Sequence, residues 1–194
     1  MTLSGIRDAI QRPMPRLLTL VCVLCALIPA QATTLTRASL DDLIQKSTSI
    51  VRGRVLNSSS SARGLLVYTY YKIQVLDRWK GAAAEQVQVQ VPGGSFHGVQ
   101  QNIAGSPVLA DGSEYVFFLW TGPSGASHVL GLSQGVLDVG RDSAGNAILI
   151  RQPGEATVLD ALTGVSGNQE PLQMKLSDFN SRVAGALKGV DKTK

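Results

Sequence analysis

The sequence predicts a mainly β protein: a partly closed antiparallel barrel with a short helix before it and a second helix after it. Three observations support this prediction. Residues 67–81 are dense in β-branched and aromatic side chains and end at Lys80-Gly81, which indicates one long strand. Residues 86–91 alternate glutamine and valine without a break, as in a strand with one buried and one wet face. Twenty glycines and eight prolines supply the turns that short strands need.

The long strand is expected to be the spine of the barrel, because a strand of this length pairs on both edges and bends. Side chains alternate between its two faces. One face carries Tyr71, Ile73 and Val75, and the other carries Tyr68, Tyr70, Lys72 and Gln74. The closest standard architecture is the OB-like barrel, which binds oligonucleotides or oligosaccharides in other proteins. A two-sheet sandwich is the alternative.

The other elements follow in chain order. Ser39 is the expected N-cap of a short helix that packs an apolar face against the barrel. Residues 49–57 are predicted to form the first strand, with a bend or bulge at Gly53, and the serine-rich stretch at 58–64 is predicted to be a solvated loop. Further strands are predicted at residues 86–91, 96–103, 115–120, 129–131, 136–139 and 147–150. The most apolar of these, 115–120, is expected to be buried on both faces.

The C-terminal part begins with a polar, turn-rich stretch at residues 152–175. A final helix is predicted from Ser177-Asp178 onward, with Phe179, Val183 and Leu187 as its apolar stripe. The predicted organisation is a signal peptide (1–32), a β-barrel domain (33–151), and a polar loop, C-terminal helix and basic tail (152–194).

The N-terminus has the composition of a secretory signal peptide. Arg16 precedes an apolar run at residues 17–28, and an Ala-x-Ala cleavage site ends at Ala32. We therefore expect a secreted or periplasmic mature protein. A membrane anchor is the alternative, although the run is shorter than the roughly 20 residues of a spanning helix. A chain that begins at Met14 also has a complete signal peptide, so translation from Met1 and from Met14 are both retained as alternatives.

Composition excludes several classes of function. Cys22 and Cys25 lie inside the apolar run, so a chain beginning at Thr33 has no cysteine for a disulfide, a metal site or a nucleophile. That chain keeps 15 basic and 13 acidic residues, a charge of +2 that is too balanced to indicate nucleic acid binding. Neither His97 nor His128 has another histidine or a carboxylate at the spacing of a metal site, so no metal is expected. The sequence also contains no phosphate-binding loop, so no cofactor is expected.

One motif has catalytic character. Residues 131–135 match the G-x-S-x-G pattern of a nucleophile elbow, with Ser133 as the nucleophile. That chemistry needs a strand-to-helix turn and a later histidine, whereas a strand pattern follows here and both histidines come earlier. The competing interpretation is that two glycines allow a tight turn between strands.

Two sets of residues are candidates for binding. Tyr68, Tyr70 and Lys72, beside Arg52 and Arg54, could stack on a ring and hold an anionic group; the alternative is that the tyrosines pack under a helix and the charges are solvated. The other set closes the long strand: Trp79 and Lys80 are candidates for anchoring a partner protein, or for plugging the barrel end.

A group of motifs resembles a known family. The residues that carry the resemblance are 51–55, Tyr68-Thr69, Lys80-Gly81, 91–94, 105–107, 112–115, Phe118-Leu119 and 131–135. They resemble exported bacterial domains without an established activity, some of them found near matrixin-type metalloproteases. The order of strands is also distantly similar to the netrin-like barrel of tissue inhibitors of metalloproteinases. Those inhibitors chelate zinc with an N-terminal cysteine, which a chain beginning at Thr33 lacks, so that mechanism does not carry over.

These observations favour an exported, non-catalytic β-barrel module that binds a protein partner, with a protease as one candidate. The alternative is a saccharide- or small-ligand-binding barrel that uses Tyr68, Tyr70 and Lys72, and a serine hydrolase that uses Ser133 ranks third. No nucleic acid partner, and no membrane after signal cleavage, is expected. The oligomeric state stays open.

Overall fold

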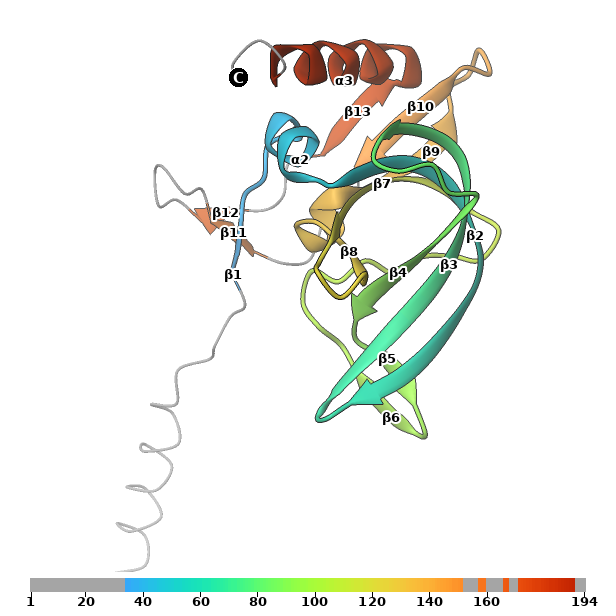
Figure 1. Ribbon diagram of the computed structural model, residues 1–194, viewed down its shortest axis with the longest axis vertical. Coiled ribbons are helices and arrows are strands. Elements are labelled where there is room, and N and C mark those ends of the chain that lie inside the picture. The colour runs from blue at the N-terminus through green and yellow to red at the C-terminus, as the bar shows by residue number, and fades with distance from the viewer. Residues whose placement is uncertain (1–33, 152–156, 160–165, 168–170, 191–194) are drawn as a thin grey trace, which may run out of the picture. The chain divides into compact units, whose positions relative to one another are not determined.

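The computed structural model describes residues 34–151, 157–159, 166–167 and 171–190, and these are mainly β (Figure 1). The first half of the chain forms β1 (Thr34–Thr36), α2 (Leu40–Lys46), β2 (Ser49–Arg63), β3 (Leu66–Lys80), β4 (Gln86–Pro92), β5 (Gly94–Phe96) and β6 (Val99–Gln101). The second half forms β7 (Glu114–Thr121), β8 (Ser127–Val129), the 3-10 helix η1 (Leu132–Gly135), β9 (Val136–Arg141), β10 (Ala147–Arg151), β11 (Thr157–Leu159), β12 (Ser166–Gly167), β13 (Leu172–Lys175) and α3 (Leu176–Val190). The predicted signal peptide lies outside the described residues.

Five strands close a barrel. β2, β3, β4, β8 and β7 are hydrogen-bonded in that order, and β7 pairs back onto β2. Every pair is antiparallel except β4–β8, which is parallel and covers only Val89 with Ser127 and Gln90 with His128. A five-stranded, partly closed ring of this kind is the OB architecture, so the predicted OB-like barrel is confirmed.

The sheet continues beyond the barrel. β9 pairs with β7, β10 with β9, and β13 with β10. The strands predicted at residues 136–139 and 147–150 are therefore confirmed, as β9 and β10, which form a hairpin. A separate small sheet pairs β1 with β11 in parallel and β11 with β12. In Figure 1 the helices α2 and α3 lie at the same end of the molecule as the added strands β9, β10 and β13.

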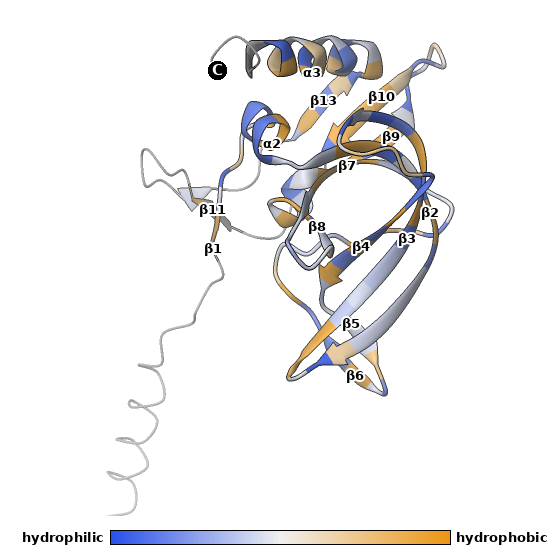
Figure 2. Ribbon diagram, in the orientation of Figure 1, coloured by the Kyte–Doolittle hydropathy of each residue, from blue (hydrophilic) through white to orange (hydrophobic). Residues whose placement is uncertain are grey.

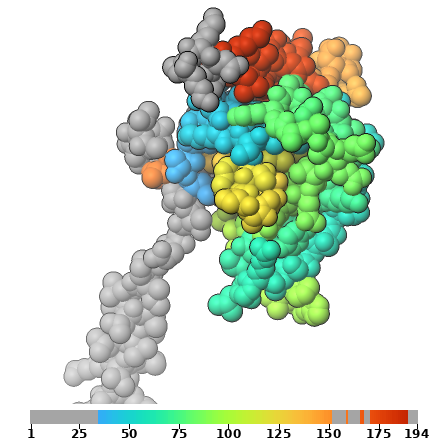
Figure 3. Space-filling view, in the orientation of Figure 1, coloured from blue at the N-terminus to red at the C-terminus, as the bar shows by residue number. Residues whose placement is uncertain are grey.

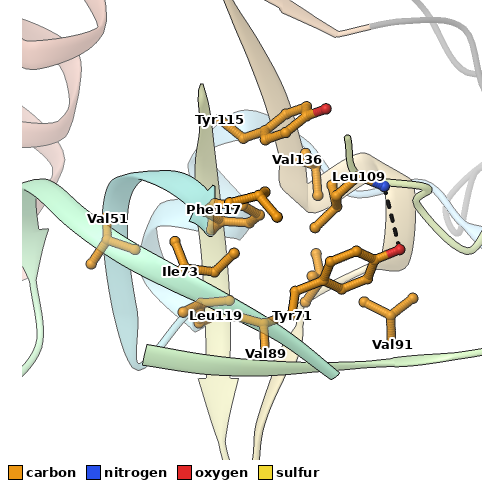
Figure 4. Close-up of a cluster of buried hydrophobic side chains, with 12 residues drawn as sticks. Val51, Tyr71, Ile73, Val89, Val91, Leu109, Tyr115, Phe117, Leu119 and Val136 are labelled. Carbon is orange, nitrogen blue, oxygen red and sulfur yellow. Dashed lines mark hydrogen bonds between the residues drawn. The ribbon is translucent and has the colours of Figure 1, made fainter. Parts of the chain in front are cut away.

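Strand β7 separates two hydrophobic clusters. Phe117 and Leu119 point into the barrel interior, whereas Val116 and Phe118 point towards the helices. The barrel cluster consists of Val51, Val55, Tyr71, Ile73, Val89, Val91, Leu109, Tyr115, Phe117, Leu119, Val129 and Val136 (Figure 4). The helix cluster consists of Leu40, Leu43, Ile44, Ile50, Val116, Phe118, Leu137, Leu149, Phe179 and Val183. The prediction that residues 115–120 are buried on both faces holds up to Leu119, since Trp120 is exposed.

The serine run at residues 58–61 is a strand, and the prediction of a solvated loop is wrong. β2 continues through it to Arg63, because the whole run pairs in register with residues 68–71 of β3. Pairing with a strongly β-prone neighbour overrides the low strand propensity of a polar run. The bulge predicted at Gly53 is confirmed: the register shifts just before it, and a Cβ there would collide with the side chain of Ile73.

Both helices begin and pack much as predicted. Ser39 Oγ accepts a hydrogen bond from the Asp42 amide at 3.0 Å, and the Asp42 carboxylate accepts one from the Ser39 amide, which makes a capping box. On α3, Phe179 and Val183 are buried in the helix cluster, and Leu187 packs at its edge. The C-terminal part therefore supplies core residues to the same sheet as the barrel.

Candidate functional site

Outward-facing side chains of the five barrel strands line up in one row. Residues opposite one another in neighbouring strands share a face. The register places Ser59, Tyr70, Gln90, His128 and Trp120 opposite one another on β2, β3, β4, β8 and β7, and we call these five residues the outer row. Trp120 is 44% exposed, and its ring centre lies 6.4 Å from that of His128. Figure 3 shows this part of β7 and β8, in yellow, at the surface.

The three residues predicted to bind a ligand lie on this same face. Tyr70 belongs to the outer row, Tyr68 lies opposite Pro92, and Lys72 lies opposite Gln88. The two tyrosines are half-buried and Lys72 is exposed. The fold thus brings the predicted residues together, and it adds Trp120 and His128, which sequence reasoning missed.

The two arginines expected beside this face are each held by a carboxylate. Arg52 Nε lies 2.8 Å from Asp77 Oδ2, and Arg54 Nη2 lies 2.6 Å from Glu114 Oε1. Surface pairs of this kind contribute about 0–1 kcal/mol to stability. Their main effect here is that both guanidinium groups are already paired with carboxylates of the same protein, which makes them less available to an anionic ligand.

Trp79 and Lys80, the residues predicted to anchor a partner, contact the two helices. Trp79 Nε1 donates to Asn180 Oδ1 at 2.9 Å, and its indole meets the edge of Phe179, with ring centres 5.0 Å apart. Lys80 Nζ donates to carbonyl oxygens at the end of α2, 2.8 Å from that of Ile44, and burial lowers the pKa of its amine. Both side chains have structural roles, and partner binding by them stays a prediction.

The G-x-S-x-G match forms a tight turn. Gly131 has a left-handed backbone at φ +71°, and a Cβ on Gly135 would collide with the carbonyl oxygen of Leu130. The turn, η1, runs directly into strand β9, whereas a nucleophile elbow connects a strand to a helix. The two glycines are therefore explained by the turn that they form.

The buried side chain of this turn is Gln134, which sequence reasoning also missed. Gln134 is 2% exposed, its Oε1 accepts from the Ala38 amide at 2.8 Å, and its Nε2 donates to the Thr36 carbonyl at 3.0 Å. These bonds fasten the segment before α2 to the barrel. A glutamine between glycines gives no sequence signal of such a role.

The histidines occupy different elements. His97 lies in the turn between β5 and β6, with φ +48° and its ring centre 4.1 Å from that of Phe96, and His128 lies on β8. Within the residues that the structure describes, no three His, Cys, Asp or Glu side chains gather in a way that could hold a metal ion. In the same residues, no helix combines the length and apolar character needed to cross a membrane.

A second surface, the hairpin tip, lies at the end of the barrel away from the helices (Figure 1). It consists of Leu65 from the β2–β3 turn, Leu66 at the start of β3 and Val99 from β6, which are 92%, 44% and 55% exposed. Gln101 braces the turn, because its Nε2 donates to the Leu65 carbonyl and its Oε1 accepts from the Val67 amide, both at 2.7 Å. The backbone that carries the exposed side chains of Leu65 and Leu66 is therefore held in place by hydrogen bonds to Gln101.

The surroundings of the hairpin tip are nearly free of charge. Residues 56–71 and 87–110 contain a single charged side chain, Arg63. In Figure 2 the end of the β2–β3 hairpin is coloured as hydrophobic, with a hydrophilic segment beside it. The centres of protein–protein interfaces are likewise depleted of Lys, Glu and Asp relative to the rest of the surface, whereas arginine is common there.

Comparison with known proteins adds no relative: the chain matches no protein-family model, no curated protein and no solved structure.

Proposed function

We propose that this protein is an exported, non-catalytic module that binds a protein partner through its hairpin tip. The observation that carries the proposal is the combination of three exposed aliphatic side chains, Leu65, Leu66 and Val99, with a backbone braced by Gln101. A bracing bond of this kind lowers the conformational entropy lost on binding. The exposed aliphatic surface gains free energy when a partner removes it from water.

The resemblance to exported domains, some of them found near matrixin-type metalloproteases, supports a protease as the partner class. A barrel end that projects Leu65 on a narrow hairpin suits insertion into an apolar pocket of such a partner. Single anchoring side chains of this kind are typical binding hot spots.

The test compares Leu65→Ser with Leu56→Ser, because Leu56 is a 39% exposed leucine of β2 outside the hairpin tip. The mature protein is titrated into a purified matrixin-type metalloprotease by calorimetry. Independently, partners are captured by cross-linking in culture medium and identified. Loss of a hot spot of about 2 kcal/mol weakens binding roughly 30-fold, and we expect this for Leu65→Ser alone. Equal affinity of both variants for an identified partner, or no partner in either assay, would refute the proposal.

A saccharide ligand on the outer row is the second candidate, and a specific observation favours it. Tyr70 and the exposed Trp120 flank Gln90 and His128 in one continuous row. Aromatic rings that stack on sugars and an imidazole that hydrogen-bonds to hydroxyl groups are components of such a site. Gln90 is 5% exposed, so the ligand-facing groups of the row are the aromatic rings and His128.

Fluorescence can test this candidate, because the chain has two tryptophans. Trp79→Phe leaves Trp120 as the reporter and keeps an aromatic ring beside Phe179. Titration with soluble chito- and cello-oligosaccharides should change the Trp120 emission in a saturable way, and Tyr70→Ala should weaken the response. An emission that no oligosaccharide alters, or a response that survives Tyr70→Ala unchanged, would count against the outer row.

A further inference from the structure

A pocket of about 380 Å³ lies where β2, β7 and β9 meet, on neither the hairpin tip nor the outer row. Four charged residues line it: Arg52, Glu114, Asp138 and Arg141. The volume is at the small end of ligand sites, which suits a single functional group or a short side chain. We call this hollow the Asp138 pocket.

Three of the four charges are already engaged. Arg52 is paired with Asp77 at 2.8 Å, and Glu114 is paired with Arg54 at 2.6 Å. Arg141 is exposed, and its Nη1 donates to the Gly145 carbonyl at 3.0 Å. Because the guanidinium group of Arg141 is exposed, water and salt screen its charge strongly, so it repels a cation in the pocket only weakly.

Asp138 is the remaining charge. Its side chain is half-buried, and burial raises the pKa of its carboxyl group. Among the residues that the structure describes, none forms a hydrogen bond or an ion pair with this carboxylate. A half-buried carboxylate without a partner is stabilised by any cation that enters beside it.

A divalent metal ion does not suit this arrangement. Ca²⁺ takes six to eight oxygen ligands, and Mg²⁺ prefers octahedral oxygen coordination. Glu114 is committed to Arg54, so Asp138 is the one carboxylate of the pocket that remains for a ligand. An organic cation needs only one counterion, and the carboxylate of Asp138 can supply it.

We propose that the Asp138 pocket binds one organic cation, a primary ammonium or guanidinium group, with Asp138 as its counterion. Such a group is carried by a free amine or by a lysine or arginine side chain of a peptide. The site is independent of the proposed function, because neither the hairpin tip nor the outer row contributes a residue to it.

The experiment is an NMR titration of the mature protein with n-butylamine, Nα-acetyl-lysine amide and Nα-acetyl-arginine amide, with Nα-acetyl-glutamine amide as the neutral control. A cationic probe should produce saturable shifts of the Val139 and Gly140 amides and should lower the pKa of Asp138. Asp138→Asn should weaken binding at least about tenfold, the effect of losing a charge-assisted hydrogen bond. Asp111→Asn, at an exposed turn outside the pocket, should leave it unchanged.

The arms separate the two sources of the cation: binding of butylamine alone supports a free amine, and binding of the amino-acid amides supports a peptide side chain. Three results with the organic probes would overturn the proposal. They are equal shifts with the glutamine control, shifts that persist in Asp138→Asn, and the absence of saturable shifts with every cationic probe. Calcium chloride that reproduces the shifts at matched ionic strength would likewise overturn it in favour of a metal.

Discussion

Replacing Gln134 by methionine should detach the segment before α2 from the barrel. The change keeps the length of the side chain and removes both ends of its amide, so Ala38 loses an acceptor at 2.8 Å and Thr36 loses a donor at 3.0 Å. A net hydrogen bond contributes about 1 kcal/mol, and an orphaned buried group costs about 1–3 kcal/mol. Thr36 is exposed and Ala38 is half-buried, so water replaces part of the loss, and we expect a total of about 2 kcal/mol.

Urea denaturation measures the global effect, and hydrogen exchange at the Ala38 amide measures the local one. Gln88→Met is the matched control, because Gln88 is exposed on β4, and surface changes of this kind usually stay within about 0.5 kcal/mol. The Ala38 amide should exchange faster in Gln134→Met and at its normal rate in Gln88→Met. Equal stability of the two variants, with unchanged exchange at Ala38, would refute the role assigned to Gln134.

Three further outcomes are expected. Val89 is fully buried in the barrel cluster and Gln88 is exposed, so Val89→Asp should cost several kcal/mol and Gln88→Asp almost nothing; equal melting temperatures would show that the register of β4 is wrong. Because burial raises the folded-state pKa of Asp138 above 3.8, its destabilising effect appears as pH rises through that raised value. Asp138→Asn should therefore be more stable than wild type at pH 7, with the difference vanishing below about pH 3.8, and a gain that persists at low pH would contradict this cause. Lys80→Met should cost about 1 kcal/mol in urea denaturation and speed amide exchange at the end of α2, and unchanged exchange there would contradict its capping role.

Local patterns predicted much of the barrel. The alternation of residues 86–91 placed Val89 inside, and the Ser39 cap began α2 where it was expected. The same alternation failed at Gln90, which is 5% exposed although it lies on the outer face. Gln90 is paired with His128 of β8, which lies beside β4 in the sheet. The two strands are far apart in the sequence, so the local alternation of residues 86–91 does not predict this contact.

The candidate sites were predictable only where a single strand holds them. Tyr68, Tyr70 and Lys72 lie on β3, so their alternation sufficed to group them. Trp120 and His128 join that group only because β8 closes the ring between β4 and β7. The sequence left Trp79 as a candidate either for anchoring a partner or for plugging the barrel end. In the structure α3 packs beside the end of the long strand, and Asn180 accepts the hydrogen bond of the indole N–H, a contact that no local pattern predicts.

The parallel ladder between β4 and β8 is the shortest in the barrel ring, and we expect the ring to open there first. It spans two residue pairs, whereas β2 and β3 are paired along almost their whole length. Local opening starts where backbone pairing is sparse, so the amides around Ser127 and His128 should exchange ahead of the rest of the ring. The outer row crosses this ladder from Gln90 to His128. A ligand held by both strands binds the closed ring and not the open one, so its occupancy would set how often the barrel opens.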